Sequence, residues 1–182
     1  SVIARFAALR REAAVVLGPA AHPRRITAVV AQPLLRWLGW PTTEVGAASS
    51  GECRLPLGAA GTDPTVLVVV PSGAVTRPDR KLIGDALGEG CRVVLVTDGQ
   101  TLRVVDGIRG DPRGVLDVDL DRCADDPAAL AWLVAVAGPA GFAAGSADSV
   151  LGLAERSEVH GRRVCAALRD GVGDALGVIT EA

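Results

Sequence analysis

Few side chains in this sequence have the type and spacing that catalysis or metal binding requires. His160 and Cys165 are five positions apart, which places them on different faces of a helix rather than in a catalytic pair. Ser72 lacks the G-x-S-x-G turn of a serine hydrolase. The four cysteines are too widely spaced to indicate a zinc site. We therefore expect neither nucleophilic catalysis nor a structural zinc.

Five aspartates gather between positions 117 and 126, and they alternate with apolar residues in 117-DVDLD-121. A calcium loop needs a turn with a glycine at a set offset, and that glycine is missing. The pattern instead favours a strand whose charged face meets solvent and resists aggregation. No G-x-x-x-x-G-K-[ST] occurs, and no G-x-G-x-x-G follows a strand pattern. We therefore expect no metal, nucleotide or other cofactor.

The elements that would position a site are strands in the middle of the chain. Five are predicted, at residues 52–57, 65–70, 92–97, 101–106 and 115–120. The run TVLVVV at 65–70 is continuous, as in a strand buried on both faces. Asp98-Gly99 between two apolar runs predicts a hairpin, and Pro56 favours a sheet edge for the first strand.

Helices are predicted at residues 2–17, 26–40, 78–89, 127–138, 148–157 and 159–182. Pro33 predicts a kink near Gln32, and Gly39 predicts the end of the second helix. The last helix carries one apolar stripe, at Val164, Leu168, Val172, Ala175, Leu176 and Ile179. The surfaces available to it are the first two helices, around Phe6, Leu9, Leu35 and Leu38, or another chain. We expect its first half to pack within the chain, and its end, from about Gly173, to fray or to lead into a following domain.

This order of elements predicts an α/β (α+β) fold, with a mixed central sheet of about 4–5 strands flanked by helices and followed by C-terminal helices. We expect residues 1–126 to form an α/β domain and residues 127–182 a helical segment packed on it, as a single compact unit.

Composition limits the partners. The formal net charge is −2 and the pI about 5.7, so no global basic field attracts nucleic acid or an acidic membrane. A local basic cluster remains in 77-RPDRK-81, directly after the buried strand. The longest apolar run, at 65–70, is too short to span a membrane. We expect a soluble, cytoplasmic protein with no membrane partner.

Three segments carry a resemblance to a known family: 33-PLLRWLGW-40, the strand at 65–70, and 94-VLVTDGQTLRVVD-106. Their order resembles that of the N-terminal nuclease-like domain of type I restriction enzyme R subunits and of type IIG-like restriction–modification enzymes. The segment 155-ERSEVHGRRVCAALRDGVGDAL-176 resembles the helices that join such a domain to a methylase domain. The resemblance implies a restriction-endonuclease-like fold over about residues 24–176.

That family hydrolyses phosphodiesters with a divalent metal, held by an Asp on one strand and a Glu-x-Lys on the next. Matched strand to strand, the Glu-x-Lys falls on Val70, Pro71 and Ser72, and the Asp falls near 54-RLP-56. An acidic residue at the start of the second helix is also missing, since Arg24, Arg25 and Ile26 stand there. The resemblance therefore implies a degenerate active site without catalytic or metal-binding residues.

Our hypothesis is a catalytically inactive binding or scaffolding module in DNA restriction–modification or phage defence. Its expected partners are DNA, bound weakly through Arg77, Arg80 and Lys81, or a methylase or other restriction–modification subunit or domain. Two alternatives remain open. One is an active Mg²⁺-dependent nuclease with a relocated site that uses Glu52, Asp63 or Asp98. The other is an unrelated α/β regulatory or protein-interaction domain in which the region of Trp37 and Trp40 lines an interface.

Overall fold

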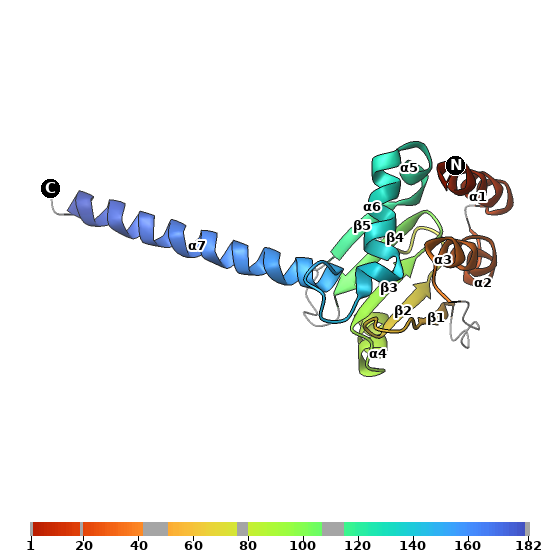
Figure 1. Ribbon diagram of the computed structural model, residues 1–182, viewed down its shortest axis with the longest axis horizontal. Helices are drawn as coiled ribbons and strands as arrows, with labels where there is room; N and C mark the ends of the chain where they lie inside the picture. The colour runs from red at the N-terminus through yellow and green to blue at the C-terminus, as the bar shows by residue number, and fades with distance from the viewer. Residues whose placement is uncertain (1, 19, 42–50, 76–79, 107–114, 181–182) are drawn as a thin grey trace.

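The computed structural model describes residues 2–18, 20–41, 51–75, 80–106 and 115–180 of the 182-residue chain. Within these, the side chains of residues 80–82, 106, 115 and 170–180 lie outside the described part. Helices cover both faces of one sheet, and a long helix extends from this body (Figure 1).

The sheet has five strands in the order β1-β2-β3-β4-β5. They are β1 (Cys53–Leu57), β2 (Thr65–Val69), β3 (Val93–Thr97), β4 (Thr101–Asp106) and β5 (Val115–Asp119). β2 and β3 are parallel, and the other three neighbouring pairs are antiparallel. The predicted mixed sheet flanked by helices is confirmed, as are the edge position of β1 and the hairpin between β3 and β4.

β2 is buried along its whole length because β1 and β3 flank it and helices cover both faces. Its side chains alternate between two clusters, as the period of a strand requires. Leu67 and Val69 join the larger cluster, while Val66 and Val68 join the smaller one. The prediction of a strand buried on both faces is therefore confirmed.

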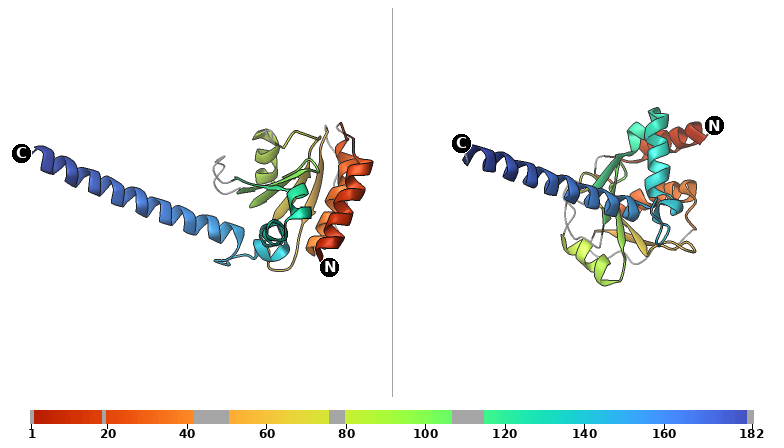
Figure 2. Two further views of the ribbon diagram at one scale, coloured as in Figure 1. Left: turned by 90° about the horizontal axis from the view of Figure 1, so that it is seen from above. Right: turned by 60° about the vertical axis from the view of Figure 1, so that its left-hand side comes forward.

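The larger cluster lies between the sheet and most of the helices (Figure 2). These helices are α1 (Val2–Val16), α2 (Pro23–Ile26), η1 (Thr27–Ala31), α3 (Gln32–Leu38), α5 (Leu120–Asp125), α6 (Pro127–Ala137) and η2 (Pro139–Phe142). The other face of the sheet carries α4 (Arg80–Gly88), whose Ala86 is fully buried in the smaller cluster. The predicted domain boundary after residue 126 falls between α5 and α6, and both helices contribute to the larger cluster.

The helical stretch from Pro23 to Leu38 is irregular in its middle. Proline has no N–H, and its ring clashes with the carbonyl four residues earlier. Before Pro33 the chain forms the wider π-helical turns of η1, in which Gln32 N–H donates to the carbonyl of Thr27. Gly39 then ends α3 in the left-handed conformation, with φ 91°. The predicted irregularity near Gln32 is thus a π-helical segment.

The C-terminal region differs from the prediction. One continuous helix, α7 (Val150–Thr180, 31 residues), replaces the two helices predicted at 148–157 and 159–182. It projects away from the body (Figure 2). Val164 and Leu168, which were predicted to pack on the first two helices, are exposed.

The packing prediction for this helix is wrong because the surface it needed is already covered. Phe6 packs on Trp37, with ring centroids 4.9 Å apart, and Leu35 and Leu38 belong to the larger core cluster.

Among the described residues, no helix is both long enough and apolar enough to cross a membrane.

Candidate functional site

The positions matched to the lost nuclease motif lie at the carboxyl end of β2. Val70 N–H donates to the carbonyl of Thr97 on β3 at 2.9 Å, and the Val70 side chain is buried in the smaller cluster. Ser72, two residues further, is half-buried beside Asp98 in a hollow. Neither side chain offers the charged oxygen that a hard divalent cation prefers.

Asp98 is a buried carboxylate near this strand end, and backbone donors surround it. Oδ1 accepts from the N–H groups of Gln100 and Thr101, at 3.0 and 2.9 Å, and Oδ2 accepts from Gly73 at 3.0 Å. The carboxylate therefore fixes the β3–β4 turn and joins it to the turn after β2. This is the structural role that Asx residues take in tight turns.

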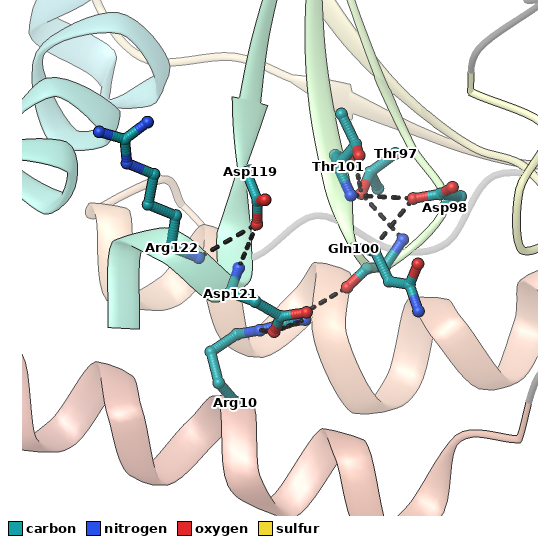
Figure 3. A network of polar contacts seen from close by, with 9 residues as sticks. Arg10, Thr97, Asp98, Gln100, Thr101, Asp119, Asp121 and Arg122 are labelled. Atoms are coloured by element: carbon teal, nitrogen blue, oxygen red, sulfur yellow. Dashed lines mark hydrogen bonds and ion pairs between the residues drawn. The ribbon is translucent and has the colours of Figure 1, made fainter. Parts of the chain in front are cut away.

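A second set of contacts attaches the first helix to the same turn (Figure 3). Arg10 Nη1 donates to the carbonyl of Gly99 at 2.6 Å, while Nε and Nη2 donate to Asp121 Oδ1 at 3.0 and 2.6 Å. The Arg10 side chain is only 8% exposed, whereas that of Asp121 is 65% exposed. A hollow of about 230 Å³ lies beside them, between α1 and the turn.

Gly99 lets α2 and η1 approach this turn closely. Its φ of 90° favours glycine, and an added Cβ would lie 3.1 Å from a methyl carbon of Ile26. Thr97 supports the same turn by donating from Oγ1 to the carbonyl of Thr101 at 2.8 Å and accepting from Gly99 N–H. The polar groups of the turn thus hold α1, α2 and the β3–β4 hairpin together.

Arg54 occupies the part of β1 to which the missing aspartate was matched, and it is surrounded by carboxylates. Its Nε lies 3.0 Å from Glu52 Oε1, its Nη1 lies 2.9 Å from Glu89 Oε1, and its Nη2 lies 3.8 Å from Asp85 Oδ2. The last two residues belong to or follow α4, so the guanidinium fastens this helix to the sheet edge. The Arg54 guanidinium thus forms ion pairs with all three acids.

Three acidic residues were candidates for a relocated nuclease site, and the structure separates Asp63 from the other two. Asp63 precedes β2, at the end of the strand opposite to Val70, and it pairs with Arg92 at 2.7 Å. Glu52 precedes the edge strand β1 and Asp98 follows β3, so both lie at the carboxyl end of β2, on the two strands that flank it. In the described part of the chain, no group of three His, Cys, Asp or Glu side chains is placed to hold a metal.

The basic residues predicted to contact DNA lie at the edge of the described part of the chain. Arg77 is outside the described residues. Arg80 and Lys81 begin α4, but their side chains are outside the described part. Their contact with DNA stays a prediction.

The cluster of aspartates supports the local structure. Asp117 is exposed, as predicted, and accepts two hydrogen bonds from Arg103, which raises the pKa of this guanidinium. Asp119 and Asp126 cap the N-termini of α5 and α6. The caps were missed in the sequence, although Asp126 before Pro127 is a recognisable helix start.

The tryptophans proposed as an interface are largely internal. Trp40 is 3% exposed and donates from Nε1 to the carbonyl of Ala137 at 2.7 Å, so the prediction that it lines an interface is wrong. Trp37 is half-buried against Phe6. His22 caps α2 by accepting from Arg24 N–H, while His160 and Cys165 are both exposed on α7.

A larger open hollow, of about 900 Å³, lies where α7 leaves the body. Asp63 and Arg92 line it from the sheet, and Ser149, Glu155 and Arg156 line it from α7 and the segment before it. Its charges are mixed, and the buried carboxylate of Asp63 is already paired with Arg92. The lining of this hollow therefore favours neither an anionic nor a cationic ligand.

Comparisons with protein-family models, with curated proteins and with solved structures find no match for this chain.

Proposed function

We propose that this chain is a catalytically inactive, restriction-endonuclease-like module that binds or supports a partner in DNA restriction–modification or phage defence. The observation that carries the proposal is the end of β2, where a buried Val70 and a neutral Ser72 occupy the positions matched to the catalytic Glu and Lys.

The surrounding acids support the same conclusion. Asp98 accepts three backbone hydrogen bonds, and Glu52 pairs with Arg54. A metal ligand at either position would first have to give up these contacts. A relocated nuclease site is therefore the weaker alternative, because its candidate ligands already have structural roles.

Two kinds of partner fit this module. A methylase or another restriction–modification subunit or domain fits the resemblance of α7 to the helices that join such units. DNA fits the basic segment of Arg77, Arg80 and Lys81, with weak affinity because the net charge of the chain is −2. The resemblance, rather than any bound molecule, supplies the restriction–modification context.

Titration calorimetry with Mn²⁺, together with incubation of the protein with supercoiled and linear DNA and Mg²⁺, tests the proposal. We expect no saturable metal site and no cleavage. The matched control is Asp98→Asn, which removes the remaining buried carboxylate near this strand end. A tight Mn²⁺ site that disappears in this variant, together with cleavage by the unchanged protein, would contradict the inactive assignment and support the relocated nuclease.

Partner binding requires its own test. A methylase subunit from a restriction–modification system can be titrated into a solution of the whole chain. The tryptophan fluorescence of this chain is followed during the titration. Saturable binding supports the scaffolding role. If neither such a subunit nor DNA binds, the regulatory-domain alternative becomes the better assignment.

A further inference from the structure

The smaller hollow, between α1 and the β3–β4 turn, lies where the sheet of an α/β protein commonly binds ligands. Its volume is about 230 Å³, and Asp98 and Gly99 line it just after the carboxyl end of β3. Ligands of open α/β sheets bind outside the carboxyl ends of parallel strands, and β3 runs parallel to β2. Pockets for drug-sized molecules measure roughly 300–1,000 Å³, so a ligand of this hollow must be smaller.

Two polar side chains in the lining are not used by the fold. Ser72 is half-buried and Gln100 is exposed at the rim. Within the described part of the chain, neither the Ser72 hydroxyl nor the Gln100 carboxamide has a hydrogen-bond partner. Figure 3 draws the hydrogen bonds of this turn, and none of them reaches the Gln100 carboxamide. Both groups are therefore available to a ligand.

The ionised side chains of the lining favour a cationic group. They are Arg10, Asp98 and Asp121. Arg10 lies 2.6 Å from Asp121, so these two charges offset each other. Asp98 is 6% exposed, and its hydrogen-bond partners are three backbone N–H groups rather than a cation. One negative charge is thus left without an opposite charge, which disfavours a phosphate or a lone carboxylate in this hollow.

Three oxygen atoms of the lining can accept hydrogen bonds from such a cation. Asp98 Oδ2 accepts only from the N–H of Gly73, at 3.0 Å, and has a second lone pair. The other two are the Ser72 hydroxyl and the carboxamide oxygen of Gln100. A primary ammonium group has three N–H donors, one for each oxygen. A single carboxylate suits an ammonium better than Mg²⁺ or Ca²⁺, which take about six oxygen ligands or more.

The rest of the wall is aliphatic. Its apolar side chains are those of Ala13, Ala14, Leu17 and Ala21, and no aromatic residue occurs among the described lining residues. Arg10 and Leu17 are seven positions apart, which corresponds to about 10 Å along a helix axis. The hollow can therefore accommodate a short aliphatic chain, but it offers no ring on which a nucleobase could stack.

We propose that the smaller hollow binds a small molecule that carries a primary ammonium group on a short aliphatic chain. The ammonium donates to Asp98 Oδ2, Ser72 Oγ and Gln100 Oε1, and the chain packs on the aliphatic wall beside Leu17. The inference goes beyond the proposed function and does not depend on it, because the ligand requires neither DNA nor a methylase.

Free amines and α-amino acids both carry this ammonium group. The carboxylate of an amino acid has a candidate partner in Arg10, because three of the five N–H donors of this guanidinium are used in the fold. Probes that differ by one charged group can therefore distinguish the two sources.

Isothermal titration calorimetry of the whole chain with isobutylamine, L-valine and isovalerate tests the proposal. Isobutylamine is valine without its carboxylate, and isovalerate is valine without its ammonium. We expect saturable binding of isobutylamine or L-valine with a dissociation constant of about 10 mM or below, and none of isovalerate. Tighter binding of L-valine would identify amino acids as the ligand class, and tighter binding of isobutylamine would identify free amines. No saturable binding of either ammonium compound, or equal binding of isovalerate, would overturn the proposal.

Ser72→Ala and Gln100→Leu test the assigned contacts. Because these side chains hold no part of the described fold, both variants should unfold at the same temperature as the unchanged chain. Each should bind the better ammonium probe about tenfold more weakly, since a hydrogen bond to a charged group is lost. Ser157→Ala, at an exposed position on α7, is the control and should leave the affinity unchanged. Unchanged affinity in both hollow variants would contradict the assigned site.

Discussion

Oδ2 of Asp98 lies 3.0 Å from the backbone nitrogen of Gly73, so a carboxylate at the end of β3 holds the turn that follows β2. The side chain is buried and its two oxygens accept three backbone hydrogen bonds. Asp98→Asn replaces one acceptor by a donor that faces the N–H of Gly73 or those of Gln100 and Thr101. We expect a loss of roughly 2–3 kcal/mol in the free energy of unfolding, measured by urea denaturation. A loss near zero would mean that the turn does not need this charge.

Removal of the Arg10 side chain should release α1 from the β3–β4 turn. Arg10→Leu leaves the Gly99 carbonyl without its donor and Asp121 without its cation. Because this guanidinium is almost fully buried, we expect roughly 2–4 kcal/mol of destabilisation in chemical denaturation. Arg11→Leu is the control, since Arg11 is the exposed neighbour and its loss should change stability little. Equal effects of the two substitutions would show that the Arg10 contacts contribute nothing.

A charge in the buried strand β2 should prevent folding. Val68 is fully buried between β1 and β3, and Val68→Asp would bury a carboxylate with no partner. The cost of several kcal/mol is comparable to the whole stability of a domain, which is about 5–15 kcal/mol. Val15→Asp, at a position that is 88% exposed, should leave thermal unfolding cooperative. A soluble Val68→Asp protein with a sharp unfolding transition would contradict the assigned burial.

Stability should fall in alkaline solution through Cys123. Burial, and then the carboxylates of Asp119 and Asp126, raise the pKa of this thiol from 9.0 to about 11. The folded state therefore keeps a proton that the unfolded state loses between these two values. The contribution is fully present below pH 9.0 and disappears as pH rises through about 11. Cys123→Ala should flatten the dependence of the unfolding free energy on pH in this window, and an unchanged slope would exclude the thiol as its cause.

Any DNA binding should be weak, independent of sequence and steeply dependent on salt. Three cations, Arg77, Arg80 and Lys81, can neutralise only a few phosphates, so the slope of log K against log salt should be no steeper than about −3. Alanine at all three positions should abolish the binding measured by fluorescence anisotropy. The control replaces Arg5, Arg11 and Arg156, which are exposed on α1 and α7, and should leave the slope unchanged. Tight binding that survives the first triple substitution would place the contact elsewhere.

The sheet was predictable because its signals are local. The β-branched runs of β2 and β3 and the Asp98-Gly99 pair each fit within a few residues of sequence. The continuity of α7 was not predictable in this way. Ser157 and Gly161 are weak helix formers, and they lie where the sequence suggested a break between two helices. Stripe residues such as Leu168 predicted a buried face, although nothing in the described chain covers this one.

Two of the polar contacts near the candidate site could not be predicted because their partners are distant in sequence. Arg54 and Glu89 are 35 positions apart, and Asp98 and Gly73 are 25 apart. Sequence alone therefore left Glu52 and Asp98 available as metal ligands. Their nearest partners are local, since Glu52 pairs with Arg54 and Asp98 accepts from the N–H groups of Gln100 and Thr101. The sequence pattern did not show that these short-range contacts form.

The ion pair between Arg10 and Asp121 spans 111 positions, which has a consequence for the order of events during synthesis. A ribosome that adds roughly 5–20 residues per second would release α1 about 6–22 seconds before α5. During this interval α1 can pack on η1 and α3, and Arg10 can reach the Gly99 carbonyl once the β3–β4 turn is made, but the carboxylate of Asp121 is still absent. α1 is therefore fully fixed only well after it is made, and a nascent chain arrested before residue 121 should leave α1 open to proteases.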